Sequence, residues 1–186
     1  YRIAAGDIVG NIVYYQNGLL TEEKPCMIAG LDYNTPWTRD TAINIWNALS
    51  ILSPEVSKNT LLAVLEEEEG NIYIGGQYWD SIIWMIGARE YCRFHKDDNF
   101  YRLAFEAGRN SVHRLEEGEF DEEDGLFRGP AVYGDGIAAY PDKYSKCPNQ
   151  GSGILEWVDY PGNPVYPKGY GCLLYTSDAA DDMQCV

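Results

Sequence analysis

The sequence predicts an all-α fold built from sequential helical hairpins, as part of a toroid of helix pairs. Apolar residues recur at helical spacing in several segments that turn residues separate. Two of these segments open on an aromatic residue followed by an acid, and the two acids, Asp40 and Asp80, lie 40 residues apart, about the length of one helical hairpin. Runs that alternate apolar and polar residues are scarce, which disfavours a fold dominated by sheets.

The N-terminal part is expected to form one helix and one loop. A broken helical period from about Ile3 to Tyr15 predicts a helix that ends near Asn17-Gly18, residue types that favour a helix C-terminus. Residues 21–36 contain two prolines and are expected to form a loop.

Two helices are expected after this loop. The first begins at Asp40 and ends before Pro54. Its apolar positions are Ile45, Leu49 and Leu52. Residues 55–65 continue the helical period as a return helix, and the acidic run at 66–69 is expected to be a solvated helix end and turn.

A second helical pair follows. An apolar helix is expected from Asp80 through Tyr91, then a polar turn at 96–99, then a helix from Phe100 to Leu115. Residues 118–153 are rich in Gly, Pro and Tyr with little periodicity, and loops of this length in compact domains are usually functional.

Composition limits the classes of function. The chain has 186 residues, 45% of them hydrophobic, which suits one domain or part of one. A formal net charge of -15 argues against nucleic acid as a partner, because phosphates would be repelled. No apolar run approaches the roughly 18 residues that predict a membrane span, so no membrane partner is expected.

The two ends of the chain carry separate expectations. The sequence begins at Tyr1 rather than methionine, so a missing N-terminus is expected and the cellular compartment stays open. Residues 172–186 read like the in-frame translation of a sequencing-library adapter, with a genuine Ala/Asp-rich tail as the alternative. The native part is therefore expected to be residues 1–171, the N-terminal portion of a longer domain.

No metal or other cofactor is expected. The five cysteines contain no CxxC pair, and the only histidines are His95 and His113, so the ligand spacing of a zinc site is missing. Both histidines are expected on return helices, away from the aromatic and acidic clusters.

Two clusters, 37–40 (Trp-Thr-Arg-Asp) and 77–80 (Gln-Tyr-Trp-Asp), combine flat aromatic side chains with charged groups at the starts of helices. This combination suits a sugar, because aromatic faces cover the apolar faces of pyranose rings while charged groups bind hydroxyls. Acids at helix N-termini also cap backbone N–H groups, worth ~1 kcal/mol each. Capping explains either acid alone, but not the tryptophan before each one.

A third cluster surrounds Asp135. Gly134 and Gly136 give the backbone freedom to project its carboxylate, and Tyr133 and Tyr140 could reduce the solvation of that group. Reduced solvation favours the protonated form that a general acid needs. The alternative is a simple Asp-Gly turn.

Three segments of the chain resemble the six-hairpin glycosidases. They are 36–43 (PWTRDTAI), 75–81 (GGQYWDS) and 124–127 (DGLF). The similar families are the glucosidase domain of glycogen debranching enzymes, the trehalases, and glycoside hydrolase family 63 with its mannosylglycerate-hydrolase relatives. The resemblance covers roughly residues 1–160, and Thr38 stands where the debranching-enzyme pattern has glycine.

The resemblance implies an (α/α)6 barrel that hydrolyses the O-glycosidic bond of an oligosaccharide or small glycoside with inversion. It implies Asp135 as the general acid, with Asp142 as the nearest rival; the family often has Gly-Trp-Asp where this chain has Tyr133-Gly134-Asp135. No residue of the chain matches the general base, so the fragment is expected to be inactive alone. The implied glycone subsite and entrance consist of Trp37, Arg39, Asp40, Gln77, Tyr78, Trp79, Asp80, Arg128 and Tyr133.

Two other functions stay open. A sugar epimerase or polysaccharide lyase on the same toroid would abstract a proton next to a carbonyl or carboxylate, commonly with His or Tyr, and no histidine occurs in the three clusters. A non-catalytic helical-repeat scaffold would tolerate asparagine at Asp40 and Asp80, because asparagine is also a good cap.

Replacing Asp135 with asparagine tests its role as the general acid. In a version of the protein that carries the general base, this change is expected to lower kcat by about 10²–10⁴-fold, the usual contribution of general-acid catalysis. Steady-state hydrolysis measures the effect, with Asp142→Asn as the matched comparison. A loss of only a few-fold for Asp135→Asn would rule it out as the acid.

Overall fold

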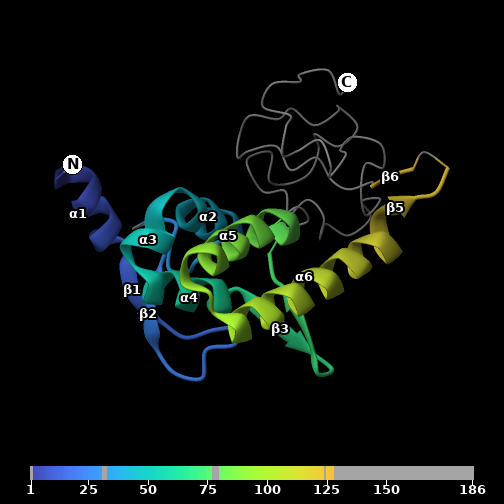
Figure 1. Ribbon diagram of the computed structural model, residues 1–186, viewed down its shortest axis with the longest axis horizontal. Helices are drawn as coiled ribbons and strands as arrows, with labels where there is room; N and C mark the ends of the chain where they lie inside the picture. The colour runs from blue at the N-terminus through green and yellow to red at the C-terminus, as the bar shows by residue number, and fades with distance from the viewer. Residues whose placement is uncertain (1, 31–32, 77–79, 124, 128–186) are drawn as a thin grey trace, which may run out of the picture. The chain divides into compact units, whose positions relative to one another are not determined.

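The computed structural model describes residues 2–30, 33–76, 80–123 and 125–127 (Figure 1). The chain divides into two units, residues 1–114 and residues 115–186. The elements are α1 (Arg2–Gly10), β1 (Ile12–Tyr15), β2 (Lys24–Met27), α2 (Thr38–Asn44), the π-helix η1 (Ile45–Leu49), α3 (Ser50–Leu52), α4 (Pro54–Ala63), β3 (Leu65–Glu68), β4 (Asn71–Ile74), α5 (Asp80–His95), α6 (Asp98–Glu119), β5 (Phe120–Asp121) and β6 (Leu126–Phe127).

The prediction of an all-α toroid is wrong, because the described residues combine helices with antiparallel β-hairpins. β1 pairs with β2, β3 with β4, and β5 with β6. The helix expected from Ile3 to Tyr15 ends at Gly10, and its second half is strand β1. The β1 sequence IVYY consists of β-branched and aromatic residues, which favour strands. Part of the expected loop at 21–36 is β2, its partner strand.

The acidic run at 66–69 is also not the end of a helix. Residues up to Glu68 form β3, which pairs with β4 through a two-residue turn at Glu69-Gly70. Both turn residues have positive φ, 51° and 80°, as the favoured hairpin turns require. In β3, Leu65 is buried and the three glutamates are exposed, so the charges face water along the strand.

The central helices match their expected positions closely. α2, η1 and α3 form one helical run from Thr38 to Leu52, and α4 starts with Pro54 in its first turn. α5 starts at Asp80 as predicted and continues to His95. α6 covers the last expected helix. These helices have apolar faces long enough for their period to be recognised.

The run 38–52 and α5 pack side by side in the same direction. Arg39 contacts Asp80 at the starts of the helices. Ala42 lies against Gly87 in the middle, where a Cβ on Gly87 would stand 2.9 Å from the Ala42 Cα. The Ser50 carbonyl contacts His95 at the far ends, 2.5 Å from its Nε2. The small residues at the middle contact allow the two backbones to approach closely, so the helix starts are held together.

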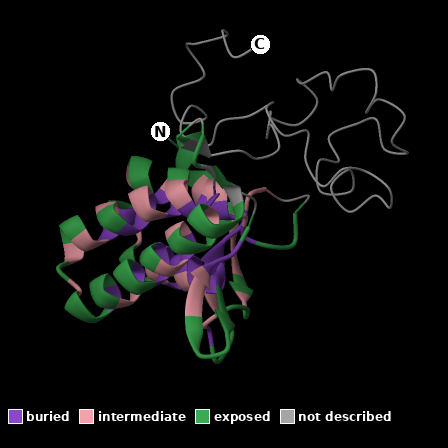
Figure 2. Cartoon of the chain, turned by 90° about the vertical axis from the view of Figure 1, so that its right-hand side faces the viewer, coloured by how far each residue is buried: buried purple, intermediate pink, exposed green. Residues whose placement is uncertain are grey.

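The core lies where these helices meet α4 and the first half of α6 (Figure 2). Trp84 of α5 is fully buried, and its indole N–H donates to the Leu61 carbonyl of α4 at 3.3 Å. Phe100 of α6 packs against Trp84 and meets Tyr91 edge to face. Aromatic residues therefore fill the centre of the bundle and fix α5 between α4 and α6.

The loop of the first hairpin caps the C-terminus of α4. Leu19 N–H donates to the Leu62 carbonyl at 3.1 Å, and the Asn17 side-chain amide donates to the Ala63 carbonyl at 3.2 Å. Gly18 has φ +59°, and a Cβ there would lie 2.5 Å from the Leu65 carbonyl. The loop at 17–19 thus supplies donors to carbonyls that the end of a helix leaves unpaired.

The second unit is described only in part. Its described residues hold the end of α6 and the short hairpin β5–β6, with Phe120 paired to Phe127. The long loop expected at 118–153 therefore contains this hairpin at its start, and residues 128–153 lie outside the described part of the chain.

Gly87→Ala tests the close contact between α2 and α5. Alanine favours helices by about 1 kcal/mol over glycine, but at this position the new Cβ meets the backbone of Ala42. We expect a net loss of about 1–3 kcal/mol in the free energy of unfolding. The matched control is Gly108→Ala in α6, where the nearest atom is the movable Met85 Sδ at 2.6 Å. Urea denaturation should show the loss for Gly87→Ala only; equal effects would contradict the close-contact explanation.

Candidate functional site

The two predicted motifs lie at the starts of α2 and α5. Trp37 is the extended residue before α2, with φ −100° and ψ 139° and no side-chain capping bond. Asp40 lies in the first turn of α2, where the helix dipole favours a negative charge. Asp80 is the first residue of α5 and is 1% exposed.

An ion pair joins the two motifs. Arg39 Nη1 lies 2.8 Å from Asp80 Oδ1, and the two side chains are 19% and 1% exposed. The residues are 41 positions apart in sequence, so this contact depends on the tertiary packing of α2 against α5. Because Asp80 is shielded from water, its charge requires such a partner.

One aromatic ring lies beside the arginine, and a second ring contacts the first. The Arg39 Cζ atom lies 5.7 Å from the centre of the Trp37 ring. Tyr33 meets Trp37 edge to face, with ring centres 6.0 Å apart. Tyr33 is exposed and Trp37 is half-buried, so the cluster offers aromatic surface beside a charged pair. Such a surface can stack against the apolar face of a sugar while charged groups bind its hydroxyls.

The segment before α5 is held against α2 by contacts that the sequence did not predict. Thr38 Oγ1 donates to the Gly75 carbonyl at 2.8 Å, and Thr38 is buried. Gly76 has φ +115°, and a Cβ there would collide with Asp80 Oδ2 and lie 2.8 Å from Thr38 Oγ1. Only glycine fits this space. The pair Gly75-Gly76 directly before the second motif was the available signal for a close approach of the backbone.

Several predicted site residues lie outside the described residues. They are Gln77, Tyr78, Trp79, Arg128, Tyr133, Asp135 and the rival acid Asp142. The structure brings together Trp37, Arg39 and Asp80, with Asp40 on the first turn of the same helix as Arg39. Tyr33 and Thr38 are additional members of this cluster.

Other reactive groups in the described part of the chain lie elsewhere. Burial raises the pKa of the Cys26 thiol to about 11, so the thiolate is scarce at neutral pH. His95 ends α5 and faces Ser50, at the opposite end of this helix from Asp80. No set of three His, Cys, Asp or Glu residues suited to hold a metal ion occurs among the described residues.

Comparisons with known proteins found no similar protein. No protein-family model matches the chain, and neither the curated proteins nor the solved structures contain a match. Among the described residues, no helix combines the length and the apolar character that crossing a membrane requires.

Asp80→Asn tests the energetic role of the ion pair. The change removes the negative charge that the half-buried Arg39 contacts, and we expect a loss of about 1.5–3 kcal/mol in the free energy of unfolding, the range for hydrogen bonds to charged groups. The control is Glu68→Gln, which removes the charge of an exposed ion pair with Arg114 and should leave stability nearly unchanged. Urea denaturation of both variants measures the difference. If Asp80→Asn is as stable as the control, the pair does not hold α2 to α5.

Proposed function

We propose that this chain is part of a glycoside hydrolase and binds an oligosaccharide or small glycoside where α2 and α5 begin. The observation that carries the proposal is the Arg39–Asp80 ion pair, which joins residues 41 positions apart, one from each motif, beside the Trp37 ring. Neither helix capping nor core packing requires an arginine, an acid and an aromatic ring at this one place. Their combination suits a ligand with apolar faces and many hydroxyls.

The geometry supports sugar binding for two physical reasons. First, Arg39 is directed by Asp80 and by the ring of Trp37, so little side-chain entropy remains to be lost when a hydroxyl binds. Second, the charge of Arg39 is balanced by Asp80, which favours a neutral ligand over an anion. The strongly acidic chain, with a formal net charge of -15, favours the same choice.

The proposed reaction is hydrolysis of an O-glycosidic bond with inversion. An inverting enzyme needs one acid to protonate the leaving oxygen and one base to activate water, ~6.5–9.5 Å apart. We assign the acid to Asp135 on the pattern of its sequence segment; it lies outside the described residues. The base is assigned to no residue of this chain, so the proposed role of the described part is to bind the sugar.

The position of His95 makes proton abstraction by this residue a poor alternative. α5 has 16 residues, with Asp80 at its start and His95 at its end. At a rise of 1.5 Å per residue, the two lie roughly 20 Å apart along the helix. His95 therefore cannot act on a sugar that contacts Asp80, which removes one base available to an epimerase or lyase at this site.

Substitution of Trp37 by alanine tests sugar binding. Trp46 is the matched control, because it is a tryptophan of the same helical run, 52% exposed and outside the Arg39–Asp80 cluster. Calorimetric titration with neutral gluco- and manno-oligosaccharides should show affinity roughly tenfold weaker for Trp37→Ala, since an aromatic contact is worth about 1 kcal/mol or more. Trp46→Ala should bind like the unsubstituted chain.

Two outcomes would reject the proposal. If none of the neutral sugars binds the unsubstituted chain, a scaffold is the better description. If only uronate-containing oligosaccharides bind and an unsaturated product forms, the chain belongs to a lyase.

A further inference from the structure

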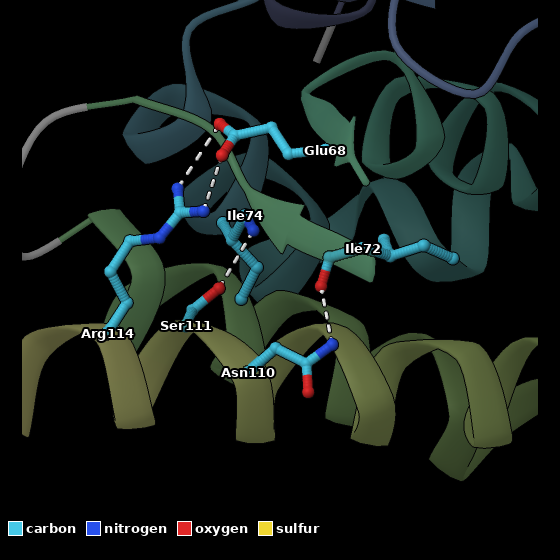
Figure 3. A network of polar contacts seen from close by, with 6 residues as sticks. All are labelled: Glu68, Ile72, Ile74, Asn110, Ser111 and Arg114. Carbon is cyan, nitrogen blue, oxygen red and sulfur yellow. Dashed lines mark hydrogen bonds and ion pairs between the residues drawn. The ribbon is translucent and has the colours of Figure 1, made fainter. Parts of the chain in front are cut away.

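The open edge of strand β4 is bound by side chains of α6. Among the residues that the structure describes, β4 pairs with β3 and with no second strand. On its other side, the Ile74 N–H donates to Ser111 Oγ at 2.8 Å, and the Asn110 side-chain amide donates to the Ile72 carbonyl at 3.1 Å (Figure 3). These backbone groups alternate along the edge, where a further strand would otherwise bind. Adjacent side chains of one helix therefore take the place of a neighbouring strand.

The contact between hairpin and helix is buried at one end and exposed at the other. Ser111 and Ile74 are 3% and 7% exposed. Near the hairpin turn, Arg114 pairs with Glu68 through two hydrogen bonds of 3.3 and 2.6 Å (Figure 3), and both side chains are exposed to water. The bond between Ile74 and Ser111 thus joins the base of the hairpin to α6, and its loss would leave a buried N–H without this partner, which is costly.

The base of the hairpin leads directly to the candidate site. Gly75 follows Ile74, and its N–H donates to the Val64 carbonyl at 2.9 Å. The Gly75 carbonyl accepts the bond from Thr38 on α2, and Gly76 fits against Asp80. Fixed contacts therefore follow one another without interruption from α6 through Ile74 and Gly75 to the starts of α2 and α5.

We propose that Ser111 is a positioning residue of the carbohydrate site: through the Ile74 N–H it fixes Gly75 and Gly76, and so the placement of Asp80 toward Arg39. The inference rests on the proposed function for its ligand. Ser111 bonds to the Ile74 N–H, so its effect on Arg39 and Asp80 would pass through the backbone of 74–76. Asn110 supports the same strand at Ile72, two residues closer to the hairpin tip.

The test compares four variants of the full 186-residue chain. Ser111→Ala removes the hydroxyl at the hairpin base, and Asn110→Ala removes the bond to Ile72. Arg114→Gln breaks the exposed pair at the tip of the same interface. Val56→Ala removes buried apolar atoms near the start of α4 and serves as a control of comparable lost stability.

Two measurements are made on each variant under conditions where it is folded. Calorimetry with the neutral oligosaccharide that binds best should show affinity about 3- to 30-fold weaker for Ser111→Ala, the usual size of coupling through a packed network. Asn110→Ala should show a smaller loss, and the other two variants none. NMR should show faster amide exchange at Gly75 and loss of the slowly exchanging Arg39 side-chain signals in Ser111→Ala. The same changes should be smaller in Asn110→Ala and missing in Arg114→Gln and Val56→Ala.

The outcomes separate positioning from stability and from the proposed function. Unchanged affinity and exchange in Ser111→Ala, or equal losses in Val56→Ala, would overturn the proposal. If Ser111→Ala does not fold, Asn110→Ala decides by the same measurements. If no sugar binds any variant, the proposed function fails. The Gly75 exchange and the Arg39 signals then decide the positioning role alone: loosening in Ser111→Ala supports it, and no change rejects it.

Discussion

The close packing of α5 against the helical run 38–52 is the constraint on which the candidate site depends. Ala42 and Gly87 allow the two backbones to approach, and the helices run in the same direction. Their starts therefore lie together, and the residues there meet although they are distant in sequence. Trp37 and Arg39 come from the first motif and Asp80 from the second, yet they form one cluster because the two helices pack in this way.

The helical part of this arrangement could be predicted from the sequence. The start of α5 at Asp80 and the helical run after Trp37 follow from apolar periodicity and from the acids at the helix starts. The hairpins could not be recognised as easily. β3 is only four residues long and carries three consecutive glutamates, so its charges suggested a solvated turn. Its pairing with NIYI across Glu69-Gly70 depends on the partner strand and turn geometry more than on its own composition.

The candidate site could be predicted only in part, because contacts between distant segments complete it. Residue type identifies Trp37, Arg39 and Asp80 as candidates, because helix capping explains the acids but not the tryptophan and arginine beside them. The roles of Thr38 and Gly76 depend on the loop before α5 returning to α2, which no local pattern encodes. The bond from Ile74 to Ser111 likewise joins residues 37 positions apart. Such contacts follow from tertiary structure and cannot be read from spacing along the chain.

The distance in sequence between Arg39 and Asp80 has a consequence for the free energy of the whole bundle. A ligand that contacts both residues binds only the folded protein, since the two groups are 41 positions apart in the unfolded chain. Occupancy and folding are then thermodynamically linked, and a ligand at 100 times its Kd adds about 2.7 kcal/mol to the folded state. A bound sugar would thus act as a removable crosslink between two helices.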